Sequence, residues 1–337
     1  DTTLERLGSG DLKILIGTHA LISETVVFND LALAVIDEQH RFGVHQRLAL
    51  SGKGNAPVDI LVMTATPIPR TLALTAYGDM DMSRITEKPA GRKPIATRAI
   101  PLSRLEEVIE GVERAVAQGE RAFWVCPLVE ENEDLDMTAA EERFDILRAT
   151  FGDRVRLIHG RMKPAEKDAA IADFRAGTAN ILVATTVIEV GVDVPDATII
   201  VIEHAERFGL AQLHQLRGRV GRSDKPSTCL LLYQAPLGET ARARLECLRT
   251  TEDGFKIADE DLRLRGAGEL LGERQSGLPN FRLADLEVHS DLIAPASDDA
   301  RLIVARDANL GSTRGEALKV LLYLFEQDDA VKTIKSG

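Results

Sequence analysis

The sequence predicts an α/β protein in which helices cover parallel sheets. Short apolar runs rich in β-branched residues, of which Thr198–Ile202 is typical, alternate with longer segments whose apolar residues recur at helical spacing. The chain has 337 residues and is 44% hydrophobic, which is enough for more than one core and predicts two or three domains. No apolar run approaches the roughly 20 residues that cross a bilayer.

Strands and helices are expected to alternate along most of the chain. The expected strands are Leu12–Ile16, Leu33–Ile36, Ile60–Met63, Ala122–Cys126, Val155–Ile158, Ile181–Ala184, Thr198–Ile202 and Cys229–Tyr233. The expected helices are Arg70–Tyr77, Leu105–Ala117, Ala140–Ala149, Pro164–Arg175 and Ala211–Val220. Pro164 suits the first position of a helix, where a missing N–H costs nothing.

The chain divides into three predicted regions. The polar segment Glu87–Pro94 contains two prolines and one glycine and is interpreted as a linker, so residues 1–90 and 91–235 are expected to form separate α/β domains. Within the second, the acidic segment Glu130–Asp136 is expected to be a mobile, solvated loop. Strand signals fade after Tyr233, and residues 236–337 are expected to be mainly helical, starting with a helical pair at 237–262.

The overall charge limits the classes of partner. The net charge is −12 and the pI is about 5.2, which argues against a strongly basic nucleic-acid-binding domain but leaves room for a local basic track. The three cysteines, Cys126, Cys229 and Cys247, have no metal-ligand spacing and are interpreted as buried thiols of a reducing compartment.

The segment Gln215–Arg222 is the most informative motif. On a helix, Gln215, Gly218, Arg219 and Arg222 would share one face, because they are spaced at i, i+3, i+4 and i+7. Such a face presents an amide and two forked, permanently charged donors, which suit the phosphates of a nucleotide. The alternative is a solvated basic face of a helix.

A second motif places two carboxylates after the apolar strand Leu33–Ile36. The carboxyl ends of strands are where α/β sheets bind ligands. Asp37 is therefore expected to hold a hydrated Mg²⁺ on nucleotide phosphates, and Glu38 to orient or deprotonate the attacking water. The alternative is an acidic cap between a strand and a loop.

Four more loops follow expected strands and carry small polar residues. Thr64 and Thr66 precede two prolines and would form a rigid relay beside the metal site. The loop after Ile181–Ala184 carries Thr185, Gly191 and Asp193, which offer a hydroxyl, close backbone approach and an acceptor. The other two loops carry Thr18 with His19, and Arg161. Taken singly, each could be an ordinary turn.

Together and in this order, these motifs resemble superfamily 2 helicases. The segments Asp37–Val44, Thr64–Thr71, Phe208–Gln215 and Asp261–Gly277 resemble the RecG family of bacterial branched-DNA helicases in particular. The resemblance implies two RecA-like lobes, the first truncated, followed by a helical hairpin, a translocation loop and C-terminal helices. It also implies ATP and Mg²⁺ as cofactors and branched and double-stranded DNA as partners.

The resemblance gives each matched residue a role. The catalytic set is Asp37, Glu38, Gln215, Arg219 and Arg222, with Asp37 holding Mg²⁺ through water. Gly191 and Asp193 join Asp37, Arg219 and Arg222 in contacting nucleotide. The DNA side carries Thr18, His19, Arg161 and Thr185. The coupling elements are His40, Thr64, Thr66, Arg244, Arg265 and Gln275, of which Arg244 lies on the hairpin and the last two on the translocation loop.

No Gly-x-x-x-x-Gly-Lys-Ser/Thr loop precedes Asp37, since the only Gly-Lys pair, Gly52-Lys53, follows it. The chain is therefore expected to be a C-terminal fragment without the phosphate loop and the junction-binding wedge domain, with little ATPase of its own. Exposed sheet edges predict poor solubility for residues 1–90 in isolation. The whole protein is expected to be a bacterial, cytoplasmic, nucleoid-associated monomer that binds no membrane and has single-strand-binding protein as a further partner.

Two other functions fit parts of the pattern. A transcription-repair coupling translocase shares the tail after Asp261, but it usually has a second acidic residue where Gln39 stands. A non-catalytic docking module would be favoured by decayed motifs, whereas both carboxylates and the arginines of the second lobe are intact.

Overall fold

The computed structural model describes residues 2–23, 25–38, 50, 53–55, 58–65, 82–87, 89, 91–127, 133–185, 194–270 and 289–325. The chain forms two compact units, Asp1–Pro67 and Ile68–Gly337. The first unit contains helix α1 (Thr2–Ser9), the 3₁₀ turn η1 (His19–Ile22) and strands β1 (Leu33–Ile36) and β2 (Asp59–Val62). The two strands pair in parallel, with Ile36 opposite Val62.

One strand expected in the first unit does not form. Leu12–Ile16 is irregular, and the side chains of Ile14 and Ile16 are 77% and 92% exposed. High β-propensity produces a strand only where a neighbouring strand supplies hydrogen bonds and a face to pack against. Among the described residues, Leu12–Ile16 has neither, so the prediction was wrong.

The second unit is built on a six-stranded, fully parallel sheet with the order β3-β8-β7-β4-β6-β5. Its strands are β3 (Ile95–Pro101), β4 (Arg121–Val125), β5 (Val155–Ile158), β6 (Ile181–Ala184), β7 (Ala197–Ile202) and β8 (Ser227–Tyr233). The inner strands are almost continuously apolar because helices cover both of their faces. The sequence analysis did not predict β3, an edge strand interrupted by the polar residues Thr97 and Arg98.

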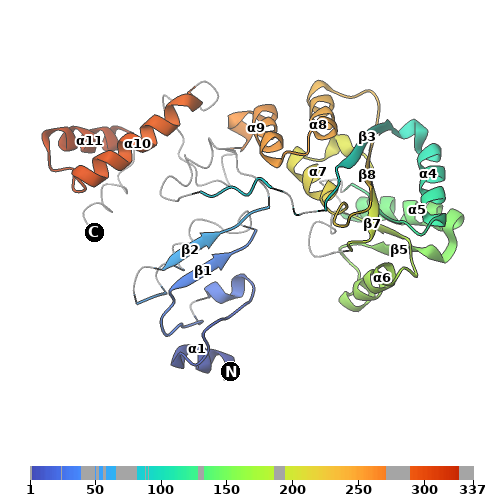
Figure 1. Cartoon of the computed structure of the whole chain (residues 1–337), viewed down its shortest axis with the longest axis horizontal. Helices are drawn as coiled ribbons and strands as arrows, with labels where there is room; N and C mark the ends of the chain where they lie inside the picture. The colour runs from blue at the N-terminus through green and yellow to red at the C-terminus, as the bar shows by residue number, and fades with distance from the viewer. Residues whose placement is uncertain are drawn as a thin grey trace. The chain divides into compact units, whose positions relative to one another are not determined.

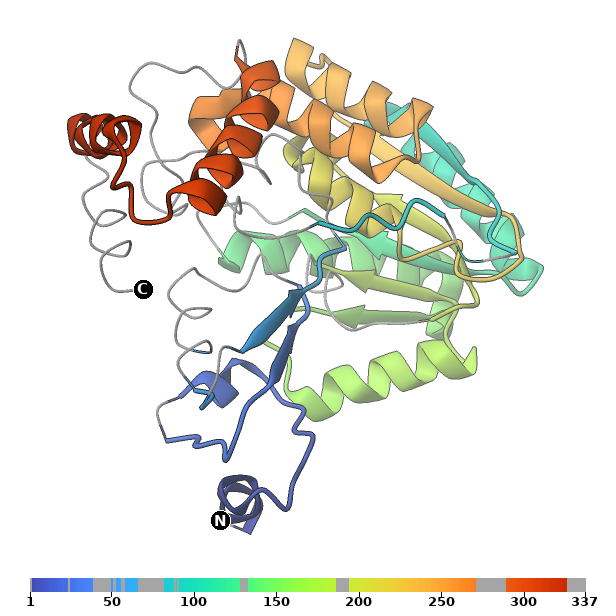
Figure 2. The ribbon, with the colours of Figure 1, turned by 60° about the vertical axis from the view of Figure 1, so that its left-hand side comes forward.

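Two helical layers enclose this sheet, as Figures 1 and 2 show. Trp124 points into the core beneath α4 (Leu105–Ala117) and α5 (Glu133–Phe151). Its neighbour Phe123 points into the opposite core, and both side chains are fully buried. The helices that contribute to this second core are α6 (Pro164–Ala176), α7 (Leu210–Arg217), α8 (Glu239–Thr250) and α9 (Gly254–Leu270).

The remaining elements are short turns and C-terminal helices. They are η3 (Leu102–Arg104), η4 (Gly152–Arg154), η6 (Ala205–Arg207), α10 (Ser290–Arg306) and α11 (Thr313–Leu324). Helix α5 begins at Glu133, so the prediction of a loop over Glu130–Asp136 was wrong for its second half. The expected helix Arg70–Tyr77 lies outside the described residues. No helix in the described ranges is both long and apolar enough to cross a membrane.

Candidate functional site

The acidic motif follows β1 directly, at the carboxyl end of the strand. The Asp37 side chain is exposed, and its Oδ1 accepts the backbone N–H of Glu38 at 2.9 Å. Glu38 has φ 53°, in the left-handed region that non-glycine residues rarely adopt. Such a conformation costs on the order of 1–3 kcal/mol and is concentrated at functional sites. The backbone therefore turns sharply where the two carboxylates were predicted to act.

The neighbouring strand brings a hydroxyl to the same edge. The N–H of Met63 donates to the carbonyl of Ile36 at 2.8 Å, which extends the β1–β2 ladder by one bond. Thr64 comes next, so it lies at the edge where Asp37 leaves the sheet. His40 and Thr66, the other coupling residues predicted for this region, lie outside the described residues.

The arginine motif does not form one helical face. Helix α7 ends at Arg217 and Gly218 is its C-cap. Of Gln215, Arg219 and Arg222, only Gln215 is therefore helical. The N–H of Arg219 donates to Leu216 O at 3.0 Å in a closing turn. Gly218 and Gly221 destabilise a continuing helix, and Gly221 has φ 72°. The expected helix over Ala211–Val220 was therefore wrong in its last turn.

The turn after α7 is nevertheless firmly held. A Cβ on Gly221 would lie 2.9 Å from Cγ1 of Ile95, so only glycine permits this approach to β3. Arg222 Nε donates to Gly218 O at 3.2 Å, which braces the turn from within. The side chains of Arg219 and Arg222 are half-buried. Arg219 and Arg222 thus lie in one firmly held turn, and two arginines so placed suit multidentate recognition of an anion.

Arg217 has a different role from its neighbours. It is 2% exposed, and its Nη1 donates to Leu248 O at 2.6 Å and Thr251 O at 2.9 Å. These carbonyls end α8, where unpaired acceptors and the helix dipole favour a cation. Burial lowers the pKa of the Arg217 guanidinium below its usual value, and nearby Cys229 and Glu252 oppose this shift. Arg217 therefore fastens the arginine motif to α8 and is not available to a nucleotide.

Two further strand-end loops lie side by side on the second unit. Ile158 of β5 pairs with Ala184 of β6, so the loops that carry Arg161 and Thr185 leave the sheet at the same edge. Thr185 is 3% exposed, and its hydroxyl has no hydrogen-bond partner among the described residues. The Arg161 side chain is exposed, and the loop before it is held by Lys167 Nζ, which donates to Gly160 O at 2.7 Å.

The remaining predicted residues either lie away from these strand ends or fall outside the described residues. Thr18 and His19 are exposed at the start of η1, in irregular chain and not after a strand. Arg244 lies on α8, where its Nε is buried without a hydrogen-bond partner in the described ranges. Arg265 lies within α9. Gly191, Asp193 and Gln275 lie outside the described residues.

The sequence analysis did not predict a buried ion pair at the carboxyl edge of the six-stranded sheet. Glu203, which follows β7, accepts from Arg143 Nε at 2.5 Å and from Arg143 Nη2 at 3.0 Å. The indole N–H of Trp124 donates to the same carboxylate at 2.5 Å. The signal was present in the sequence: like Asp37, Glu203 is an acid directly after an apolar strand. Both oxygens of the buried Glu203 carboxylate accept hydrogen bonds from side chains of the second unit, which indicates a structural role.

The cysteine thiols behave as structural groups, as expected for Cys126 and Cys229. Both side chains are buried, and Cys247 is partly buried. Burial raises the pKa of the Cys229 thiol to about 12 and raises that of Cys126 well above its usual value. Neither thiol ionises near neutral pH, so neither serves as a nucleophile.

Known families match the second unit in two places. The helicase conserved C-terminal domain matches residues 102–224, which run from η3 through the arginine motif. The C-terminal part of domain 3 of the ATP-dependent DNA helicase RecG matches residues 251–323, from the end of α8 into α11.

Individual relatives extend the similarity across most of the chain. The ATP-dependent DNA helicase RecG of Escherichia coli K12 is 55% identical over 287 residues, covering 84% of this chain and 41% of the relative. RecG of Bacillus subtilis is 48% identical, covering 90% of this chain and 45% of the relative. A structure of RecG bound to a three-way DNA junction is 45% identical with a TM-score of 0.64, covering 87% of this chain and 37% of that one. The chain thus spans less than half the length of these relatives.

Proposed function

Because this chain belongs to the RecG family, we propose that it works as part of an ATP-dependent DNA helicase that remodels branched DNA, such as stalled replication forks and Holliday junctions. The observation that carries the proposal is the 55% identity to a RecG helicase over 84% of the chain. The similar structure, described as RecG bound to a three-way DNA junction, supports branched DNA as the substrate class.

For the nucleotide, the residues present fit magnesium and a triphosphate. Asp37 is an exposed carboxylate with one oxygen engaged by the Glu38 N–H, which leaves its other oxygen for a metal-bound water. Arg219 and Arg222 supply fixed positive charge for the terminal phosphate, and Gln215 supplies an amide from the last turn of α7. Gly191 and Asp193 would contact the nucleotide. Bound Mg²⁺–ATP would supply the phosphoryl group that is transferred to water.

Glu38 would orient and deprotonate that water. Its left-handed backbone fixes the direction in which the carboxylate leaves the strand end. A non-glycine residue adopts this conformation only where the surrounding structure imposes it. This supports selection for the position of the side chain.

DNA would be held by loops at the carboxyl ends of the strands. Arg161 offers an exposed cation and Thr185 a hydroxyl, from loops that leave paired strands. Thr18 and His19 would contribute from the first unit. Because the net charge is −12, we infer only a few phosphate contacts from these residues.

Further roles follow the family pattern. His40, Thr64, Thr66, Arg244, Arg265 and Gln275 would couple the state of the nucleotide to movement on duplex DNA. We propose that the protein is a monomer of the bacterial cytoplasm, associated with the nucleoid, with single-strand-binding protein as a partner. A transcription-repair coupling translocase is not favoured, because the matched tail profile is that of RecG.

The test uses the full-length protein. ATP hydrolysis and strand separation are measured with a three-way junction and with a linear duplex of equal length and composition. We expect the junction to stimulate hydrolysis more strongly and to be the DNA that is remodelled. Equal stimulation by both DNAs with no junction remodelling would overturn the branched-DNA assignment, and no ATP hydrolysis with either would overturn the motor assignment.

A further inference from the structure

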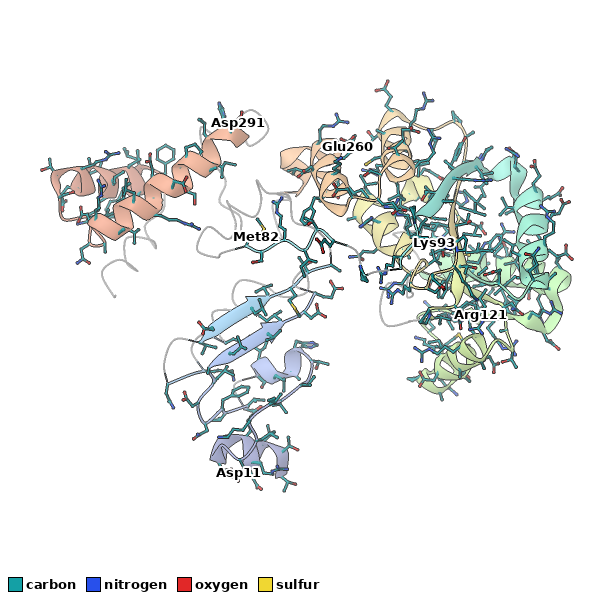
Figure 3. All side chains as sticks on the ribbon, viewed as in Figure 1. Asp11, Met82, Lys93, Arg121, Glu260 and Asp291 are labelled. Carbon is teal, nitrogen blue, oxygen red and sulfur yellow. The ribbon has the colours of Figure 1, made fainter. Side chains whose placement is uncertain are left out.

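The chain that leads into the second sheet rests on the start of α9. Residues 82–87 run into the predicted linker Glu87–Pro94 and belong to the second compact unit, and Figure 3 labels Met82 and Lys93 near the two ends of this connection. The guanidinium carbon of Arg84 lies 4.9 Å from the centroid of the Phe255 ring, the second residue of α9. This is a cation–π distance.

The same connection is held a second time where β3 begins. The backbone N–H of Ile95 donates to a carboxylate oxygen of Glu252, in the turn between α8 and α9. The side chain of Ile95 packs against Gly221 of the arginine motif. Ile95 thus joins three parts of the second unit: the incoming chain, the helical hairpin and the turn that carries Arg219 and Arg222.

The hairpin turn is itself rigid. Asp253 Oδ1 accepts the N–H of Phe255 at 2.9 Å, which caps the start of α9. Arg217 fixes the other side of the turn through Thr251 O. Both contacts to the connection, at Glu252 and at Phe255, therefore come from a preorganised segment of four residues.

We propose that the α8–α9 turn is a clamp on the chain connecting the two predicted lobes, with Arg84 and Glu252 as its positioning residues. The proposal rests on the proposed function, because a clamp on this connection matters to a motor whose lobes move relative to each other. The two contacts differ in kind. The Glu252 contact is a charge-assisted hydrogen bond to the backbone, whereas the Arg84 contact is a partly exposed stacking interaction that can open and close.

This difference gives the clamp a fixed end and a releasable end. Ile95 stays anchored to the hairpin while the chain around Arg84 can detach from Phe255. Movement of the hairpin then changes the length of connecting chain that stays bound to the second unit. A simple structural brace predicts lost stability on mutation, whereas the clamp predicts lost coupling between hydrolysis and DNA movement at unchanged stability.

The first test measures the clamp itself in this chain. Limited proteolysis within residues 82–87 and amide hydrogen exchange of Ile95 are followed in the wild type, Arg84→Ala, Arg84→Lys, Glu252→Ala and Glu252→Gln. We expect Arg84→Ala to raise the rate of proteolytic cleavage within residues 82–87 by about two- to fivefold, the range for one exposed cation–π contact, and Arg84→Lys to restore most of the resistance. Glu252→Ala should expose the Ile95 amide, and Glu252→Gln, which keeps an acceptor, should expose it less.

The second test measures coupling in the full-length protein. Arg84→Ala is expected to keep the DNA-stimulated ATPase rate within twofold of the wild type while the number of junctions remodelled per ATP falls at least twofold. The matched control is Arg249→Ala, an arginine of the same hairpin that pairs only locally with Glu246 among the described residues. It should change neither quantity.

The outcomes separate the two proposals. A wild-type protein without ATP-driven remodelling refutes the proposed function and leaves the exchange result to stand for the clamp alone. An active wild type with an unchanged ratio of remodelling to hydrolysis in Arg84→Ala refutes the clamp. Unchanged proteolysis within residues 82–87 in Arg84→Ala refutes it as well.

Discussion

Arg217 donates two hydrogen bonds from one guanidinium nitrogen, to Leu248 O at 2.6 Å and to Thr251 O at 2.9 Å. Of the three arginines in the motif, the most buried one thus binds the protein, while Arg219 and Arg222 lie in the turn beyond the helix. The motif therefore has a structural part and a part that can meet a ligand. The two parts should respond differently to mutation.

Replacing Arg217 with methionine should destabilise the second unit. Methionine keeps most of the apolar volume but leaves the α8 carbonyls without their donor, and bonds from charged donors contribute about 1.5–3 kcal/mol. We expect urea denaturation of this chain to show a loss of about 2–3 kcal/mol. Arg249→Ala is the control and should change stability by less than about 0.5 kcal/mol, as an exposed pair does. A stability equal to that of the wild type would contradict the fastening role of Arg217.

Replacement of Arg219 or Arg222 should affect turnover far more than folding, with a small loss of stability in Arg222→Ala because its bond to Gly218 O is lost. In the full-length protein, Arg219→Ala and Arg222→Ala are each expected to lower the rate of ATP hydrolysis by roughly 10³-fold. Lysine should restore little, because it lacks the forked planar donors of arginine. Steady-state ATPase assays measure the effect and thermal melts provide the control. A variant that hydrolyses ATP at the wild-type rate would remove that arginine from the proposed site.

Glu38→Gln should separate nucleotide binding from hydrolysis. Glutamine keeps the shape of the side chain but cannot accept a proton from water, and general-base catalysis contributes about 10²–10⁴-fold. We expect ATP affinity to stay within a few fold of the wild type while the hydrolysis rate falls at least 10²-fold. Equilibrium binding of a labelled nucleotide and single-turnover hydrolysis report the two quantities. Unimpaired hydrolysis would exclude Glu38 as the base.

The buried Arg143–Glu203 pair should be sensitive to loss of one partner. Arg143→Met leaves the Glu203 carboxylate buried with the Trp124 indole as its one remaining side-chain donor among the described residues, and breaking such a pair costs about 3–5 kcal/mol. The double variant Arg143→Met/Glu203→Gln should recover part of this loss, because the remaining group is neutral. Trp124 is the single tryptophan of the chain, so its fluorescence reports the site directly. Independent, additive effects of the two changes would show that the groups are not coupled.

The turn between α10 and α11 should weaken in acid. Hydrogen bonds from the Ser312 hydroxyl and from the Ser312 and Gly311 N–H groups lower the pKa of Asp307 below its usual value. A depressed folded-state pKa means that the stabilisation is fully present above the ordinary aspartate value of about 3.9 and is lost as the pH falls through and below it. The protection factors of the Gly311 and Ser312 amides, which correct for the slower intrinsic exchange in acid, should fall as the pH drops below about 4. In Asp307→Asn, protection should be lower at pH 7 and should lose this pH dependence.

The sequence predicted the sheet of the second unit better than its site. Buried parallel strands such as β6 are short, continuous apolar runs. Such runs are typical of strands in a covered parallel sheet, so these strands were predictable. The edge strand β3 carries two adjacent polar residues, Thr97 and Arg98, and follows a linker with two prolines, so only its pairing with β8 identifies it as a strand. In the same way, Leu12–Ile16 had the propensity for a strand and lacked the partner.

The candidate site shows the same limit. The ends of the apolar runs predicted where strands stop, and so predicted that Asp37, Glu38 and Thr185 lie just after the carboxyl ends of strands. The role of Arg217 depends on carbonyls at the end of α8, about thirty residues away in sequence. No local pattern carries that information. Glu203 had the same sequence signal as Asp37, and only its contacts distinguish a structural acid from a candidate ligand.

The pairing of β3 with β8 joins the first strand of the six-stranded sheet to the last. During synthesis, residues 95–101 leave the ribosome well before residues 227–233, and until then β3 has no neighbour to complete its ladder. Closing so long a loop is slow compared with forming local structure. Nascent chains that stop before Tyr233 therefore hold an open strand that can pair with other chains, which makes this interval the one in which a chaperone would have most effect.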